Sequence, residues 1–211
     1  MEITCLYYTA NRENPEFEKK IQTNLLNNCG SIPIISVSQK PINLGVNICV
    51  GERGNSYINE YRQILIGLEQ IKTEYFISCE ADFLYPKDYF TFKPQGENIY
   101  RSDNVWMAYD KFFKKPYSEG AQIAKTEFMK DFITEYLKGL PEWYDGRPQE
   151  SDDFFQTYFE HQKKLWKLPF TFFHSNPCVS FKTGAGVRKK TNIEGAGISD
   201  LPVWGNIKQY E

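Results

Sequence analysis

The stretch Tyr75-Phe76-Ile77-Ser78-Cys79-Glu80-Ala81-Asp82-Phe83-Leu84-Tyr85-Pro86 joins a hydrophobic run to two closely spaced acids. Its first part is rich in aromatic and apolar residues, which is typical of a strand buried on both faces. Pro86 lacks an amide hydrogen, so the strand is expected to end before it. Acids at the carboxyl end of a buried strand lie where open α/β sheets bind ligands. The spacing alone fits two solvated acids in an ordinary loop equally well. The surrounding sequence is therefore needed to choose between a ligand-binding site and an ordinary loop.

The chemistry of Glu80 and Asp82 suits a hard divalent cation. Mg²⁺ and Mn²⁺ are commonly held by one or two carboxylates together with a phosphate. Such an ion would offset the charge that builds on a leaving diphosphate. We therefore predict Mn²⁺ or Mg²⁺ as the cofactor, with Asp82 and Glu80 as ligands.

Strand and helix patterns alternate through the first half of the chain. Strands are predicted at 3–8, 32–38, 46–50 and 75–80, and helices at 15–29 and 57–71. Helices interleaved with strands predict an α/β fold, with a mostly parallel sheet covered on both faces. The second half is less regular, with strands predicted at 105–109, 168–173 and 178–182 and helices starting near Thr126 and near Ser151 or Asp152. The absence of a linker-like segment predicts one domain over 1–211.

The composition excludes several classes of protein. Among 211 residues, 41% are hydrophobic and 16% aromatic, which argues against disorder. A net charge of -2 argues against a general polyanion-binding protein, although a local basic patch could still bind nucleic acid. No apolar run reaches the roughly 20 residues of a membrane span. The five cysteines are scattered singly and the N-terminus lacks a signal-peptide pattern, so we expect a cytoplasmic protein.

Several cations could bind phosphate. Arg53 lies beside glycines at a predicted helix start, where free amides and the helix dipole favour anions, and Arg12 follows the first strand. Lys182 and Arg188 belong to a glycine-rich basic segment, 182–190, that could close over a diphosphate or contact nucleic-acid phosphates. Each of these residues could also be an ordinary surface cation.

Two further groups could take part in chemistry. His174 follows an aromatic strand and could supply an imidazole to the metal, or it could simply end the strand. Glu150 and Asp152 crowd a predicted helix start just after Trp143 and Tyr144, and acids beside aromatic rings suit a sugar hydroxyl. Helix capping would account for at least one of these acids without any catalytic role.

Four stretches of the chain, taken in order, resemble a GT-A-type glycosyltransferase, similar to small family-2-like enzymes of bacterial and phage genomes. These stretches are residues 7–12, 34–41, 51–69 and 75–82. Glu80-Ala81-Asp82 resembles the DxD motif of that fold, with Glu in the first position. The resemblance implies a Rossmann-type sheet, a nucleotide-binding half at 1–90 and an acceptor-binding half at 91–211. It also implies that Thr9 and Arg12 lie near the nucleotide and Arg53 near the diphosphate.

The resemblance is weaker in the second half. Residues 150–153 resemble the acidic motif that heads the acceptor-side helix, which implies that Asp152 or Glu150 is the catalytic base. His174 resembles the C-terminal metal histidine in rough position, whereas another register places Lys182-Thr183 there and leaves the metal without a protein imidazole.

The expected function is a metal-dependent glycosyltransferase that moves a sugar from a nucleoside-diphosphate donor, UDP-sugar first among them, to an acceptor hydroxyl. The acceptor could be a glycan or a hydroxymethylated base in phage DNA. Two alternatives stay open: a nucleotidyltransferase, and a non-catalytic module that binds nucleotide or glycan. The loop at residues 9–12 is short and free of glycine, which weighs against a nucleotidyltransferase.

Overall fold

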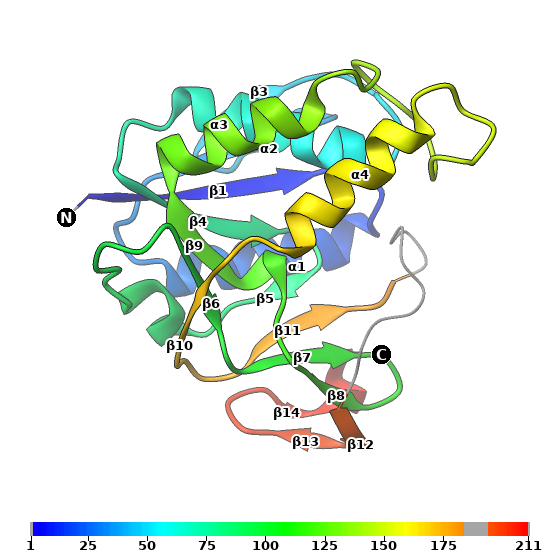
Figure 1. The fold of residues 1–211 in the computed structure, drawn as a ribbon. Coiled ribbons are helices and arrows are strands. Elements are labelled where there is room, and N and C mark those ends of the chain that lie inside the picture. Colours follow the sequence, from blue (N-terminus) through cyan, green and yellow to red (C-terminus); the bar gives the residue numbers. More distant parts are fainter. Residues whose placement is uncertain (1, 184–193, 211) are drawn as a thin grey trace.

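The computed structural model describes residues 2–183 and 194–210, which form two main β-sheets and four α-helices (Figure 1). The larger sheet has seven strands in the order β10-β6-β9-β4-β1-β2-β3. The strands of this sheet are β1 Ile3–Thr9, β2 Ile34–Ser38, β3 Val46–Cys49, β4 Tyr75–Glu80, β6 Ile99–Ser102, β9 Gln122–Lys125 and β10 Thr171–Phe173.

The smaller sheet has five strands in the order β12-β8-β7-β11-β5. The strands of this sheet are β5 Phe83–Leu84, β7 Val105–Ala108, β8 Phe112–Lys115, β11 Cys178–Phe181 and β12 Glu194–Ile198, and a separate hairpin pairs β13 Asp200–Leu201 with β14 Gly205–Asn206. Strand β5 follows β4 after only two residues. The acid pair therefore lies where the chain passes from one sheet to the other.

Two of the four α-helices in the described part of the chain begin at a capping side chain. The α-helices are α1 Pro15–Asn28, α2 Tyr57–Gln70, α3 Thr126–Leu137 and α4 Phe155–Trp166, and short 3₁₀ helices cover Lys87–Thr91, Glu119–Ala121 and Ile207–Tyr210. Asn14 caps α1 by accepting the backbone N–H of Glu16 at 2.9 Å, and Ser56 caps α2 by accepting that of Asn59 at 3.1 Å. No α-helix in the described part of the chain has the length and hydrophobicity needed to cross a membrane.

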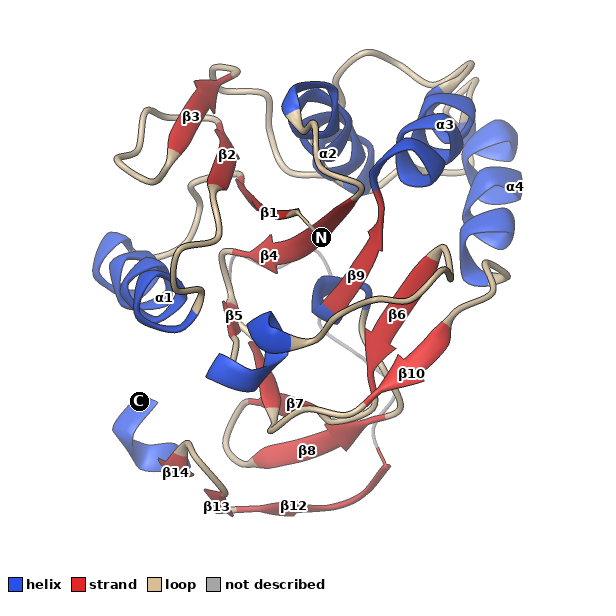
Figure 2. Ribbon diagram, turned by 90° about the vertical axis from the view of Figure 1, so that its left-hand side faces the viewer, coloured by secondary structure: helices blue, strands red, loops and turns tan. Residues whose placement is uncertain are grey.

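The larger sheet is mostly parallel and is covered by helices on both faces, as the sequence predicts. Strand β1 pairs in parallel with β2 and β4. Its side chains alternate between faces: Tyr7 belongs to the hydrophobic core under α1, whereas Leu6 belongs to the core under α2 and α3. Figure 2 shows α1 on one side of the sheet and α2 and α3 on the other. The predicted α/β fold class is confirmed.

The second half of the chain differs from the prediction. Strand β9 is inserted between β4 and β6 and runs antiparallel to both. The strands predicted at 105–109 and 178–182 exist as β7 and β11, but they pair with each other in the smaller sheet. The sequence could locate these two strands but not their partners, because strand pairing is set by contacts between distant segments.

The packing of α2 on the larger sheet requires the small residue Gly67. A Cβ atom added there would lie 2.2 Å from Cδ1 of Leu6 and 3.2 Å from Cγ2 of Val37. The helix backbone therefore approaches β1 and β2 more closely than any side chain permits.

We expect Gly67→Ala to destabilise the protein by about 1–3 kcal/mol, because overpacking outweighs the gain in helix propensity. Urea unfolding followed by circular dichroism measures this difference. The control is Gln70→Ala on the exposed end of the same helix, which should change stability by less than about 0.5 kcal/mol. A Gly67→Ala variant as stable as the wild type would contradict the close packing.

Candidate functional site

A pocket of about 620 Å³ lies at the carboxyl ends of β1 and β4, where the two sheets meet. Its walls come from the segment after β1, the start of α2, the 3₁₀ helix Glu119–Ala121, the ends of β8 and β11, and the last turn of α4. Glu80 and Asp82 both line it. The predicted position of the acid pair at a strand end thus coincides with the pocket.

Glu80 is held in place by two tyrosines and a glycine. The hydroxyl of Tyr8 donates to Oε1 of Glu80 at 3.1 Å. The hydroxyl of Tyr85 accepts the backbone N–H of Glu80 at 2.9 Å and donates to the carbonyl of Gly120 at 2.7 Å. A Cβ atom at Gly120 would lie 2.5 Å from the Glu80 carboxyl group, so a larger residue there would force this carboxyl group to move.

The charges of the two acids are poorly solvated. Burial raises the pKa of Glu80, although the hydrogen bond from Tyr8 and the charges of Lys115 and Lys182 lower it. Burial first, and then the Glu80 carboxylate, raise the pKa of Asp82 to about 7, against the opposing charges of Lys182 and Lys115. Two like charges so close together favour either a shared proton or a bound cation.

The donor set around the acid pair fits a hard cation. Across residues 2–183 and 194–210, no group of three or more His, Cys, Asp or Glu side chains is arranged to hold a metal ion. The protein can therefore offer the Glu80 and Asp82 carboxylates, and a Mg²⁺ or Mn²⁺ ion here would take its other ligands from phosphate and water. The same donor set does not fit a structural zinc site.

Three of the predicted donor-binding residues line the pocket beside the acid pair. Thr9 ends β1, and its carbonyl accepts a hydrogen bond from the Gln63 side chain at 2.8 Å. Arg12 is half-exposed and forms an ion pair with Asp145 at 3.7 Å. Lys182 follows β11, and its charge acts on both acids. The predicted Arg188 lies outside the described residues.

The prediction for Arg53 needs correction, because this residue does not line the pocket. Its Nε donates to the carbonyl of Val50 at 2.9 Å, and its guanidinium lies over the Trp143 ring at 5.1 Å. The following residues, Gly54 to Tyr57, do line the pocket. The start of α2 is thus at the site, but the arginine side chain is turned away by an aromatic partner that lies far along the sequence.

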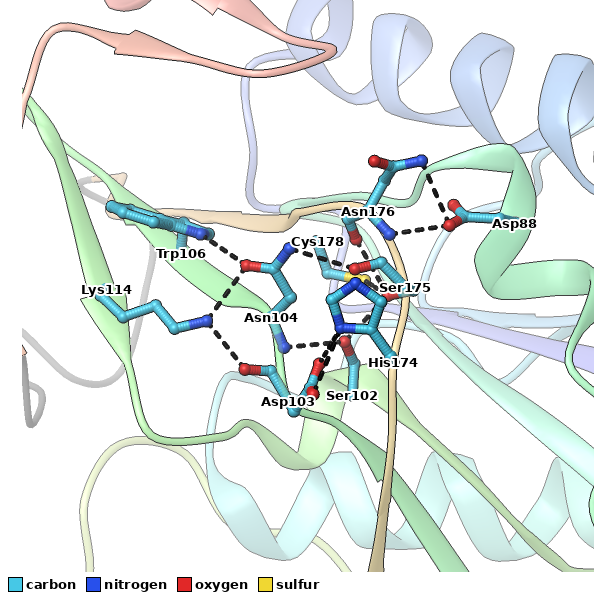
Figure 3. Close-up of polar contacts among 10 residues, drawn as sticks. All are labelled: Asp88, Ser102, Asp103, Asn104, Trp106, Lys114, His174, Ser175, Asn176 and Cys178. Carbon is cyan, nitrogen blue, oxygen red and sulfur yellow. Dashed lines mark hydrogen bonds and ion pairs between the residues drawn. The ribbon is translucent and has the colours of Figure 1, made fainter.

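His174 is also not brought to the acid pair. It is 80% exposed, and its Nδ1 lies 3.0 Å from Oδ1 of Asp103 (Figure 3). The network around it contains Asn104, whose Oδ1 accepts from Trp106 and from Lys114, rather than either member of the acid pair. His174 follows β10, three strand positions or about 14 Å across the sheet from β4. The expectation that it completes the metal site is therefore not supported.

The predicted catalytic base is likewise displaced from the pocket. Neither Asp152 nor Glu150 lines it. Asp152 accepts a hydrogen bond from the Tyr144 hydroxyl at 2.7 Å and from the backbone N–H of Gln149 at 2.8 Å. It orders the loop before α4 instead of capping the helix, which begins only at Phe155. The pocket contacts the opposite, C-terminal end of α4.

Sequence reasoning missed several pocket residues. The missed acids are Glu13, Glu60 and Glu119, and the missed cation and aromatic residue are Lys115 and Trp166. No local motif identifies them, because they come from four separate segments that only the fold brings together. The one available signal was the pair Glu119-Gly120, an acid beside a glycine in a segment rich in aromatic residues.

The raised pKa of Asp82 predicts how pH affects the stability of the metal-free protein. Its carboxyl titrates near 3.9 when unfolded and near 7 when folded, so stability falls as pH rises through this window. We expect Asp82→Asn to be more stable than the wild type at pH 8, by about 2 kcal/mol, and the difference to shrink towards pH 4.

Urea unfolding at several pH values, with chelator present, measures this difference. Asp153→Asn, which removes an exposed carboxyl outside the pocket, is the matched control and should show no pH-dependent gain. If Asp82→Asn and the wild type were equally stable at pH 8, the charge of the Asp82 carboxylate would not be destabilising, and the inference would be wrong.

No family model matches the sequence, and a search of curated proteins finds no match. Among solved structures, the chain is similar to the bifunctional IspDF from Campylobacter jejuni, with 12% identity, a TM-score of 0.49 and coverage of 83% of this chain and 50% of that one. This chain thus spans half the length of IspDF.

Two further solved structures are similar over most of both chains. They are the inositol-1-phosphate CTP transferase from T. maritima (11% identity, TM-score 0.47, coverage 88% and 91%) and a glycosyltransferase involved in the glycosylation of the major capsid of PBCV-1 (13% identity, TM-score 0.45, coverage 82% and 82%). At this level the likeness concerns the arrangement of strands and helices and assigns no activity.

Proposed function

We propose that the chain is a metal-dependent glycosyltransferase that moves a sugar from a nucleoside-diphosphate donor, a UDP-sugar in the first instance, to an acceptor hydroxyl. The observation that carries this proposal is the acid pair Glu80 and Asp82 at the end of β4, inside a pocket and faced by Lys115 and Lys182. Paired carboxylates opposite cations at a strand end suit a cation and a diphosphate bound together.

In this proposal Asp82 and Glu80 hold Mn²⁺ or Mg²⁺. The ion, when bound, would stabilise the negative charge of the departing diphosphate. Lys115 and Lys182 neutralise further charge there, and Arg12 supplies a cation at the end of β1, where the nucleotide would lie. A pocket of about 620 Å³ is within the range of small-molecule sites.

The acceptor proton has to be taken by an acid that reaches the pocket. Asp152 and Glu150 do not line it, whereas Glu13, Glu60 and Glu119 do. The argument for a DNA acceptor depends on the basic segment 182–190, most of which lies outside the described residues. The five free cysteines support a reducing compartment, and we propose the cytoplasm as the site of action.

The second candidate function is a nucleotidyltransferase, which would use the same metal site on a nucleoside triphosphate and release pyrophosphate. The third is a non-catalytic module that binds nucleotide or glycan without turnover. The product formed discriminates among the three, because only a glycosyltransferase releases nucleoside diphosphate from a nucleotide-sugar.

We expect one of UDP-, GDP-, CMP- or dTDP-sugars to raise the melting temperature only when Mn²⁺ is present, because a ligand that binds the folded state stabilises it. A UDP-, GDP- or dTDP-sugar that binds should also slowly release its nucleoside diphosphate, whereas a CMP-sugar, which carries a single phosphate, would release CMP. Asp82→Asn and Glu80→Gln should abolish both effects, with a loss of release of about 100-fold or more. Thermal shift and a nucleotide-release assay measure these outcomes.

Asp153→Asn is again the matched control and should retain both effects, since this exposed acid lies outside the pocket. Pyrophosphate released from a nucleoside triphosphate would favour the nucleotidyltransferase. Binding without turnover under any acceptor would favour the module. If the donor still raises the melting temperature of the double variant Asp82→Asn and Glu80→Gln, the proposed metal site is wrong.

A further inference from the structure

The pocket has two chemically different sides. Its cations, Arg12, Lys115 and Lys182, lie at the end of β1 or act on the acid pair. The side towards α4 is instead lined by aromatic, amide and carboxylate groups: Tyr61, Tyr117, Glu119, Gln162 and Trp166. Aromatic rings and hydrogen-bonding groups suit a neutral ligand with many hydroxyl groups. A phosphate would instead favour the side of the pocket where the cations lie.

Glu119 has a buried ionic partner on this side. Its Oε1 lies 3.9 Å from the guanidinium of Arg101, a residue that is only 2% exposed. The guanidinium in turn lies over the rings of Tyr117 at 5.0 Å and Phe170 at 4.4 Å. Burying an arginine is costly, so it persists here with an ionic partner and two aromatic rings. Arg101 thus attracts one carboxylate oxygen of Glu119, whose side chain remains 36% exposed at the pocket surface.

A second hydrogen bond fixes Glu119 from the side of α2. The hydroxyl of Tyr61 donates to Oε2 of Glu119 at 3.4 Å. Glu119 also precedes Gly120, which packs against the Glu80 carboxyl group. Glu119 therefore lies next to the acid pair, at the boundary between the two sides of the pocket.

Trp166 is the last residue of α4 and is 50% exposed at the pocket rim. The helix that carries it is anchored, because Nε2 of Gln162 donates to the Tyr136 hydroxyl and the Tyr136 ring lies 4.6 Å from that of Tyr61. An indole held half-exposed at a pocket rim is suited to stacking on the apolar face of a sugar ring. Trp166 and Glu119 stand on the same side of the pocket, joined through this chain of contacts.

We propose that Trp166 and Glu119 form the acceptor subsite and that the acceptor is a neutral carbohydrate. Trp166 stacks on the acceptor sugar, and the Glu119 carboxylate accepts a hydrogen bond from one of its hydroxyls. Among the described residues, the pocket wall contains Glu13, Glu60 and Glu119 in addition to the acid pair, and carboxylates that no metal neutralises would repel a polyphosphate acceptor such as DNA. This inference rests on the proposed glycosyltransferase function, because it assigns the second substrate of the same site.

The test is binding of the full chain to an array of neutral oligosaccharides and to a duplex containing hydroxymethylated bases, each with and without UDP and Mn²⁺. We expect neutral glycans to bind and the duplex not to bind. Trp166→Ala and Glu119→Gln should each weaken glycan binding about tenfold or more, and Trp166→Phe should retain most of it. Tyr109→Ala, which removes a 69% exposed aromatic outside the pocket, is the control and should bind like the wild type.

A separate thermal-shift measurement with the donor nucleotide shows which proposal fails. If the donor stabilises the protein only when Asp82 is present, but glycans bind equally well without Trp166 or Glu119, the proposed acceptor subsite is wrong and the proposed function stands. Binding of the modified duplex in place of glycans would overturn it as well. An equal loss of donor and glycan affinity in Trp166→Ala would place this residue in the donor site and reject the inference. Glycan binding that requires Trp166, without any donor effect, would support the subsite and reject the transferase.

Discussion

The carboxylates of Glu80 and Asp82, which are separated by one residue, lie at the end of β4. Burial and the repulsion between like charges make their ionisation unfavourable there. A protein maintains such an arrangement only if the surrounding structure holds the groups in place. Here Tyr8 binds the Glu80 carboxylate, and Tyr85 binds the Glu80 backbone. The repulsion is relieved when a proton or a cation joins the pair, and this is the physical basis of the proposed metal site.

The same region also links the two sheets. The Tyr85 ring stacks between Phe83 and Tyr89, at 5.1 Å and 4.9 Å, and its hydroxyl bridges β4 to Gly120. The chain leaves β4 through the acid pair and pairs at once with β11 of the smaller sheet through β5. Asp82 is therefore attached to the smaller sheet as well as to β4, since its carbonyl accepts the backbone N–H of Phe181 in β11 at 2.8 Å.

Charge is distributed unevenly around the pocket, and this unevenness separates the roles proposed for its two sides. Cations oppose the acid pair from β8 and β11, whereas the side towards α4 combines rings with a carboxylate oriented by the buried Arg101. A donor carrying a diphosphate and an acceptor carrying only hydroxyl groups would be attracted to different sides. The structure thus offers a physical basis for binding two unlike substrates in one cavity.

The amino-acid sequence by itself determined the α/β class, the position of the acid pair after a buried strand and the first residues of α1 and α2. These features depend on local properties: the periodicity of apolar residues, the missing amide hydrogen of Pro86, and the short side chains of Asn14 and Ser56. Each could be predicted because the cause lies within a few residues of the effect.

Only the tertiary structure decided which side chains reach the pocket. Arg53 stacks on Trp143, His174 pairs with Asp103, and Asp152 binds Tyr144, and each contact turns a predicted site residue to another use. Glu119 and Trp166 reach the pocket through packing between distant segments, and β9 is placed between β4 and β6 by pairing with both. The direction of a side chain after a strand depends on which partner lies nearest in space, and local sequence carries no record of that partner.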